Sequence, residues 1–313
     1  MRVPELPEVE TIVRELRPHV VGRTILDARV DWARSIAHPV EDIPRFCAGL
    51  KGRRIARLAR RGKFVVAHLD GGQHLLIHLR MSGRLLLSPQ GRPEHLRLVL
   101  DLSDQGRLYF YNQRKFGRLW LVEDTGTVFG DLGPEPLSEA FTPELFLAMV
   151  RQRRGMLKPL LLNQRFLAGL GNIYVDESLF RAGIHPQRKA GTLSDGDVAS
   201  LHAAIQGVLR QALDHHGTTF DGIFVRPQGE EGRQQEGLLV YGQAGQPCAR
   251  CGTSVERIVV GGRGTHFCPQ CQPLRRPGPA GDLRHPGPQE LEGDCGPHWP
   301  ECHSSLQEPG PDA

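Results

Sequence analysis

The sequence predicts an α+β protein, with an N-terminal two-layered β-sandwich and flanking helix followed by a helical domain that carries a four-cysteine ribbon. Three observations predict it. Short apolar stretches separated by Gly and Asp-Gly turns occupy much of residues 24–122, helical periodicity replaces them from Thr142, and two Cys-x-x-Cys pairs lie within residues 248–271. A chain of 313 residues also exceeds the usual size of one hydrophobic core.

Apolar spacing predicts the first helix. Leu6, Val9, Val13 and Leu16 fall on one helical face, and Gly22 lies near the end. Short strands are expected next, because β-branched and aromatic residues gather between turn residues. They cover residues 24–32, 53–59, 64–69, 74–79, 96–102, 107–111 and 118–122.

The second half of the chain reads as helical. Apolar residues recur at helical spacing from Thr142 and again over residues 173–180. The strongest helix begins at Ser194 as N-cap and stops at Gly217, with an apolar face of Val198, Leu201, Ile205, Val208 and Leu209.

Composition divides the chain further. We expect a β-sandwich domain over residues 4–133, a helical domain over 138–225 and a ribbon over 238–272. Residues 273–313 are rich in Pro, Gly and charge, a composition that buries no core, and are expected to be disordered.

The paired cysteines predict a structural zinc site. Cys248 and Cys251 are separated by sixteen residues from Cys268 and Cys271, the spacing of two knuckles that supply four thiolates to one tetrahedral ion. Four thiolates leave zinc no open position for catalysis. Two disulfides are the less favoured alternative, because no signal peptide is evident. Cys47, Cys295 and Cys302 show no ligand spacing, and Cys47 is expected in the core.

Charge and hydropathy limit the function classes. No apolar run is long enough to span a bilayer, which predicts a soluble cytoplasmic protein without a membrane partner. The formal net charge of +4 is unevenly distributed, because residues 1–274 hold 36 Lys and Arg against 28 Asp and Glu. A basic folded part suits a surface that binds phosphates.

The N-terminal run that begins Pro4-Glu5-Leu6-Pro7 contains a possible nucleophile. A free N-terminal proline is a secondary amine whose pKa lies near about 7.7 to 8, so about a tenth is unprotonated at neutral pH. Such an amine can attack a sugar C1′ and form an iminium, and Glu5 can handle the proton if burial raises its pKa. Taken alone, the run is better explained as a helix lead-in with Pro and acidic residues in the first turn.

Two glycine-rich segments suggest phosphate contacts. Residues 255–260 and 265–267 are expected to form a hairpin with the turn Gly261-Gly262-Arg263-Gly264, so that Arg263 at its tip can bind phosphate oxygens. Gly169 and Gly171 permit a tight turn before Asn172, which opens a helix whose free N–H groups attract a phosphate. Asn172 can also serve as an N-cap.

Together these motifs resemble formamidopyrimidine-DNA glycosylases, which excise oxidised purines and cleave the abasic site by β,δ-elimination. The resemblance covers residues 4 to about 272 and includes Pro4 to Thr11, the helix-two-turn-helix segment Leu162 to Pro186, and Arg263 to Cys268. It implies that Pro4 forms the Schiff base, Glu5 is the acid, Lys63 is a proton donor for β-elimination, and Arg263 acts in δ-elimination. One structural Zn²⁺ and a damaged DNA duplex are the implied cofactor and partner.

The resemblance also implies residues that open the duplex. Met81, Arg114 and Phe116 enter the minor groove and fill the gap left by the extruded base, while His95, Arg154, Lys158 and Asn172 contact DNA. Asn112-Gln113 replaces the family's Asp-Pro before Arg114. A monomeric, nucleoid-associated bacterial enzyme is expected.

Two alternatives stay open at this point. The related branch of the superfamily removes oxidised pyrimidines, although the Leu6 to Thr11 continuation and Phe116 favour oxidised purines. The second alternative is a non-catalytic protein that binds damaged DNA. Met1-Arg2-Val3 precede Pro4 in the sequence, so the Pro4 nitrogen is part of a peptide bond and is not a nucleophile. We expect Val3 to be the true initiator, read as methionine and removed, so that the mature protein begins at Pro4.

Overall fold

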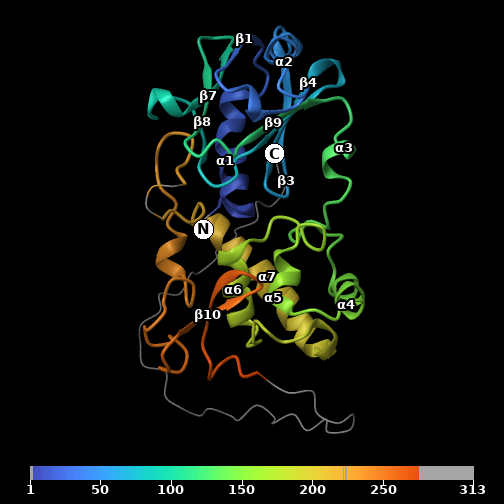
Figure 1. Cartoon of the computed structure of the whole chain (residues 1–313), viewed down its shortest axis with the longest axis vertical. Helices are drawn as coiled ribbons and strands as arrows, with labels where there is room; N and C mark the ends of the chain where they lie inside the picture. The colour runs from blue at the N-terminus through green and yellow to red at the C-terminus, as the bar shows by residue number, and fades with distance from the viewer. Residues whose placement is uncertain (1–2, 221, 223, 275–313) are drawn as a thin grey trace, which may run out of the picture. The chain divides into compact units, whose positions relative to one another are not determined.

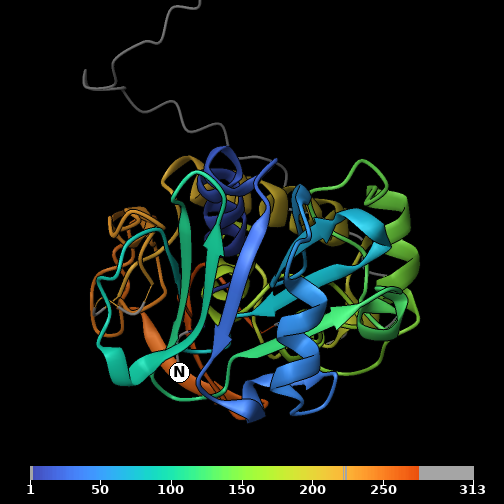
Figure 2. The same ribbon diagram turned by 90° about the horizontal axis from the view of Figure 1, so that it is seen from above.

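The computed structural model describes residues 3–274 with the exception of residues 221 and 223. Two sheets form the predicted β-sandwich. One has the strand order β1-β7-β8-β6, and the other has the order β2-β9-β5-β4-β3. Figure 2 shows the strands of the two sheets as separate layers. The strands are β1 (Ile25–Val30), β2 (Ile36–His38), β3 (Ile55–Arg61), β4 (Phe64–Leu69), β5 (His74–His78), β6 (Gly83–Leu86), β7 (Leu96–Leu102), β8 (Arg107–Asn112) and β9 (Arg118–Val122).

Helix α1 (Leu6–Val20) confirms the first predicted helix. Glu5 is its N-cap, and a capping box joins Glu5 and Glu8, because each side chain accepts a hydrogen bond from the other residue's backbone N–H. The predicted apolar face is fully buried in the sandwich, except that Leu6 packs into the core of the helical part. The helix therefore begins between the two cores.

Some elements of the sandwich were not predicted. They are strands β2 and β6 and helices α2 (Ile43–Leu50) and α3 (Gly126–Phe129). Strand β6 spans four residues and begins with glycine, so it offers little alternation to detect. Short 3-10 helices are η1 (Ala33–Ser35), η2 (Asp70–Gly72), η3 (Pro93–His95), η4 (Ala190–Thr192) and η5 (Gln234–Gly237).

Helices dominate the second half, as expected. They are α4 (Pro143–Arg151), the unpredicted α5 (Leu157–Leu162), α6 (Asn172–Arg181) and α7 (Asp195–Asp214). Figure 1 shows them gathered in one region in green to yellow. The Ser194 side chain caps α7 by accepting a hydrogen bond from the Asp197 N–H, and Gly217 adopts a positive φ of 83° just beyond the helix. Both predicted boundaries of α7 are thus present.

The ribbon contains the predicted hairpin with a tighter turn. β10 (Glu256–Val260) pairs with β11 (Arg263–Phe267), and Val260 lies opposite Arg263. Only Gly261 and Gly262 connect the strands, with φ of 58° and 76°, a geometry that suits a type I′ turn. The expected four-residue turn with Arg263 at its tip was therefore wrong, and Arg263 is the first residue of β11.

The described residues belong to one compact unit. Separate apolar clusters fill the sandwich, the helical part and the ribbon. The boundaries 4–133, 138–225 and 238–272 stay predictions. The expectation about the tail falls outside the described residues beyond Leu274, as do Cys295 and Cys302. Cys47 packs against the sandwich core. Among the described residues, no helix is long and apolar enough to cross a membrane.

Candidate active site and nucleic-acid interface

A cavity of about 540 Å³ brings together most of the predicted catalytic residues. Its walls come from the start of α1, the β3–β4 turn, the loops after β5 and β8, the start of α6, and β11. Six predicted site residues line it, namely Glu5, Lys63, Met81, Phe116, Asn172 and Arg263. A cavity of this size can hold an extruded base.

Glu5 lies at the centre of this arrangement. Its carboxyl Oε1 accepts a hydrogen bond of 3.0 Å from the backbone N–H of Ile173, in the first turn of α6. A Cβ at Gly171 would overlap the Glu5 carboxyl, so the residue before the helix has to be glycine. One of the N–H groups that were expected to attract a phosphate at this helix start, that of Ile173, is therefore occupied by the Glu5 carboxyl group.

Burial sets the protonation of the site. Glu5 is 2% exposed, and this desolvation raises its pKa to about 7, against the opposing influence of Lys63. Desolvation also lowers the pKa of Lys63, which Glu5 and Glu8 oppose. A carboxyl group that titrates near neutral pH suits a general acid.

Glu8 holds the first turn of α1 in place. Its Oε1 accepts hydrogen bonds from the Tyr174 hydroxyl and, at 2.7 Å, from the Thr218 N–H, while Oε2 accepts from the Glu5 N–H at 2.8 Å. Desolvation raises the pKa of Glu8. Three segments far apart in the sequence are thereby joined below Glu5.

Pro4 is buried beside Glu5, but Val3 rather than Pro4 lines the main cavity. Pro4 lines a smaller neighbouring cavity together with Glu8, Ile173 and other residues. The Pro4 nitrogen here belongs to the Val3–Pro4 peptide bond. The residue that covers the expected nucleophile from the cavity side is thus Val3.

The β3–β4 turn presents Lys63. The turn consists of Gly62 and Lys63, and Gly62 adopts a φ of 54°. Glu135 fixes it by accepting hydrogen bonds from the Gly62 N–H at 2.5 Å and from Arg61 at 2.9 Å. Arg60 also pairs with Glu135, at 2.6 Å.

Asn172 and Arg263 are brought together by the carbonyl oxygen of Gly264. The Asn172 side chain donates to this oxygen at 2.9 Å, and the Lys158 ammonium donates to it at 3.1 Å. Asn172 is the first residue of α6, and Gly171 is the N-cap, so the alternative role of Asn172 as an N-cap was wrong. The Asn172 side chain instead ties α6 to β11, where Arg263 is exposed toward the cavity.

Lys158 does not lie where a DNA contact requires it. Its side chain is fully buried and forms an ion pair of 2.6 Å with Asp176. The other carboxylate oxygen of Asp176 accepts a hydrogen bond from the His266 N–H at 2.9 Å. This burial is at odds with the predicted direct contact between Lys158 and DNA. Lysine is almost never fully buried unless it is paired with an opposite charge, and here the partner is Asp176. Lys158 holds the ribbon strand against α5 and α6.

Met81, Arg114 and Phe116 lie on two adjacent loops at the cavity mouth. Phe116 is 53% exposed, so its side chain is not part of the core. Met81 is half-buried and lines both this cavity and a second one of about 600 Å³, which Arg114 and His95 also line. Arg154 is exposed between α4 and α5 and lines neither of these two cavities.

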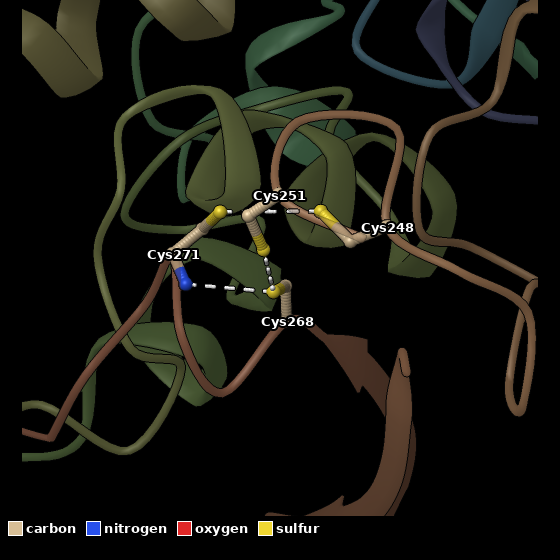
Figure 3. Close-up of side chains that lie close together, drawn as sticks. All are labelled: Cys248, Cys251, Cys268 and Cys271. Atoms are coloured by element: carbon tan, nitrogen blue, oxygen red, sulfur yellow. Dashed lines mark hydrogen bonds between the residues drawn. The ribbon is translucent and has the colours of Figure 1, made fainter. Parts of the chain in front are cut away.

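The four predicted zinc ligands converge, as Figure 3 shows. Their sulfur atoms all lie within 4.8 Å of one another. The Cys248–Cys271 and Cys251–Cys268 sulfur pairs are 3.9 and 3.5 Å apart, close to the separation of about 3.8 Å expected around a tetrahedral zinc. The four thiol ligands fit one structural Zn²⁺, which ties the two ends of the β10–β11 hairpin together.

Sequence reasoning missed several residues of the cavity, among them His78, Arg80, Arg118 and Tyr241. Burial, together with Arg80 and Lys63, lowers the pKa of His78 to about 3, so the imidazole is neutral at pH 7. Arg80 carries a positive φ of 55°, a strained conformation for a non-glycine residue. That strain has no signature in a single sequence.

The chain is similar to known proteins over most of its length. The family models for the formamidopyrimidine-DNA glycosylase N-terminal domain, its H2TH domain, and the zinc finger found in FPG and IleRS match residues 3–119, 132–222 and 245–274. The formamidopyrimidine-DNA glycosylase of Chloroflexus aggregans is 46% identical over 281 residues, covering 87% of this chain and 99% of the relative.

Two solved structures have the same fold. The MutM (Fpg) protein of Thermus thermophilus superposes with a TM-score of 0.79 at 42% identity, over 87% of this chain and 100% of that one. The Lactococcus lactis enzyme, bound non-covalently to DNA containing an AP site, gives 0.78 at 36% identity, over 86% and 99%. The chain belongs to the formamidopyrimidine-DNA glycosylase family and is a zinc-containing, DNA-binding glycosylase of base excision repair.

Proposed function

We propose that Pro4 is the nucleophile with which this oxidised-purine DNA glycosylase displaces a damaged base, and that Glu5 is the general acid. The proposal requires that Pro4 is the first residue of the active enzyme. One observation carries it. Glu5, which directly follows Pro4, is a buried carboxyl at the floor of a cavity lined by Lys63 and Arg263, and its pKa is raised to about 7.

The chemistry begins with the lone pair of the free Pro4 nitrogen. It forms a bond to the sugar C1′ as the bond from C1′ to the base breaks, and the base leaves with that electron pair. The proton that the attacking nitrogen has to give up passes to the departing base, which restores the nitrogen lone pair. Glu5 protonates O4′ as the C1′–O4′ bond breaks, and this ring opening prevents the displaced base from re-forming its bond to C1′. The nitrogen lone pair forms the C1′–N double bond, and the product is an iminium between Pro4 and the opened sugar.

Strand cleavage follows from the same iminium. Loss of a C2′ proton expels the 3′ phosphate, and a second elimination expels the 5′ phosphate. We assign Lys63 to proton transfer in the first elimination, because its pKa is lowered by burial beside Glu5. We assign Arg263 to binding the DNA phosphates, because its side chain is exposed at the edge of the cavity. The next residue, Gly264, is held in place by the hydrogen bond from the Asn172 side chain to its carbonyl oxygen. Water finally hydrolyses the iminium.

Base extrusion is assigned to the two loops at the cavity mouth. Exposed Phe116 and half-buried Met81 are apolar side chains beside Arg114, the composition of a wedge that enters between base steps. His95 and Arg154 are assigned to DNA contacts beyond the cavity. We further propose that the enzyme acts as a monomer on damaged duplex DNA of the bacterial nucleoid, in the cytoplasm.

Matched duplexes test the substrate class. One carries 8-oxoguanine and the other an oxidised pyrimidine in the same sequence, and released bases are measured separately from strand cleavage. We expect faster release of 8-oxoguanine, and loss of that release in Glu5→Gln. Equal or faster release of the pyrimidine would contradict the oxidised-purine assignment, and binding without any release would favour the damage-binding alternative.

A further inference from the structure

Two loops that carry the proposed wedge residues come from different strands. Met81 lies between β5 and β6, and Arg114 and Phe116 lie between β8 and β9. If both loops are to enter the duplex together, their separation has to be fixed before DNA binds, because each moving part adds an entropic cost on ordering. The structure contains an internal connection between them.

Asn112, the last residue of β8, makes this connection. It is 1% exposed and lies opposite Gly83, the first residue of β6. Its side-chain Nδ2 donates a hydrogen bond of 3.2 Å to the carbonyl oxygen of Leu79, which also accepts from the Gly83 N–H at 3.0 Å. A residue at the root of the Phe116 loop thus holds the backbone at the root of the Met81 loop.

The same side chain also packs beneath its own loop. A Cβ on Gly117 would lie 2.8 Å from the Asn112 Nδ2, so the chain that leaves Phe116 passes directly over the amide. Behind it, the buried guanidinium of Arg97 donates to the Asn112 carbonyl oxygen at 3.2 Å and to the Leu96 carbonyl at 2.7 Å. The backbone carbonyl of Asn112 is therefore held by Arg97, and its side-chain Nδ2 is held by the Leu79 carbonyl.

A second hydrogen bond also joins the two loops. The Arg114 N–H donates to the Ser82 hydroxyl oxygen at 3.0 Å. The Arg114 guanidinium lies 3.9 Å from the Met81 sulfur. Ser82 and Asn112 thus take part in two separate hydrogen bonds between the two loops.

We propose that Asn112 is a positioning residue for base extrusion, which couples the Met81 loop to the Phe116 loop so that the two wedge side chains enter the duplex as one unit. In this chain the amide makes the link, because its Nδ2 donates to the Leu79 carbonyl, which a carboxylate, an acceptor only, cannot do. The inference rests on the proposed function of Met81 and Phe116. It assigns no contact with DNA to Asn112 itself.

A double-mutant cycle tests the coupling. We expect Asn112→Ala to slow 8-oxoguanine excision from duplex about tenfold, and to change cleavage of a pre-formed abasic site less than twofold, because no base has to be extruded there. In a Met81→Ala background the same substitution should cost less than twofold, because the wedge is already lost. Ser82→Ala should show the same dependence without altering a buried side chain. Asp42→Ala, which removes an N-cap hydrogen bond on α2, is the stability control.

A binding measurement separates this inference from the function on which it rests. The probe is a duplex with 2-aminopurine opposite a tetrahydrofuran site, whose fluorescence reports unstacking when the wedge enters. If Met81→Ala leaves the signal of the unaltered protein unchanged, the wedge assignment itself is wrong. If Met81→Ala lowers it but Asn112→Ala and Ser82→Ala do not, or if the effects of Asn112→Ala and Met81→Ala simply multiply in excision, the coupling role of Asn112 is overturned.

Discussion

The Glu5 carboxyl accepts a hydrogen bond of 3.0 Å from the backbone N–H of Ile173, a residue 168 positions later in the chain. The N-cap of one helix is thereby bound to the first turn of another, at the junction of the sandwich and the helical part. A carboxyl placed there is shielded from water, and this shielding raises its pKa to about 7. The fold thus places next to Pro4 a carboxyl group that titrates near neutral pH, as the proposed general acid requires.

The raised pKa predicts the pH dependence of excision. Glu5 has to be protonated, which favours pH below about 7, whereas the Pro4 amine has to be unprotonated, which favours pH above about 7.7. Single-turnover excision should therefore be bell-shaped with its maximum near neutral pH. A rate that rises steadily up to pH 9 would exclude Glu5 as the acid.

The same shift predicts a pH-dependent stability. Between its ordinary pKa of 4.5 and about 7, the folded protein keeps a proton on Glu5 that the unfolded chain releases. This contribution to the free energy of unfolding is fully present below pH 4.5 and is lost as the pH rises through 7. Urea unfolding at pH 5 and pH 8 should show a smaller decrease for Glu5→Gln than for the unaltered protein. An identical decrease in both proteins would show that the pH dependence of stability comes from a group other than Glu5.

Removal of zinc should separate DNA binding from the stability of the sandwich. One zinc per chain is expected, and Cys248→Ser or Cys268→Ser should abolish duplex binding, because the ribbon strand that carries Arg263 loses its anchor. The thermal transition of the sandwich should change little. Cys47→Ser is the matched control, since Cys47 packs in the sandwich. Unchanged affinity of chelated protein for lesion DNA would show that the ribbon plays no part in binding.

Salt dependence distinguishes the phosphate contacts from the wedge. Arg263→Ala should weaken binding to damaged and undamaged duplexes alike and reduce the slope of log K against log salt by about one unit. Phe116→Ala removes no charge, so it should leave the slope unchanged while slowing excision from duplex. If Phe116→Ala alters the slope as much as Arg263→Ala does, the wedge assignment fails.

Substitution of the buried Lys158 should change the stability of the protein and leave the salt dependence of DNA binding unchanged. Lys158→Met keeps the length of the side chain but leaves Asp176 unpaired inside the protein, which should cost about 3 to 5 kcal/mol of stability. The double variant Lys158→Met/Asp176→Leu should recover much of this loss. The salt slope of DNA binding should not change in the stable double variant. If Lys158→Met reduces the salt slope without loss of stability, the predicted direct contact between Lys158 and DNA would be supported.

The sequence allowed most of the fold to be predicted, because periodicity and caps are local. Ser194 is the N-cap of α7 and Gly217 lies just beyond its end, and neither signal depends on residues that are distant in the sequence. The four-residue strand β6 escaped detection, since its existence depends on pairing with β8. Cysteine spacing alone predicted the zinc site. Pro4 and Glu5 needed the family resemblance, because a proline before a helix is ordinary.

The features of the site that were not predicted depend on contacts between residues that lie apart in the sequence. The burial of Lys158 depends on Asp176, eighteen residues later, and on β11. The contact of Asn112 with Leu79 joins two loops whose proximity the sequence does not reveal. His78 lies in an ordinary alternating strand, and only the packing around it shows that its imidazole faces the cavity.

Reductive trapping tests the central claim most directly. The enzyme is incubated with abasic duplex and borohydride, and the cross-linked peptide is then identified by mass spectrometry. We predict that the DNA remnant is attached to the nitrogen of Pro4 as the first residue of the protein, and that Glu5→Gln still traps on a pre-formed abasic site while it fails to release 8-oxoguanine. A cross-link on Lys63, or efficient trapping by protein in which Val3 still precedes Pro4, would contradict the account.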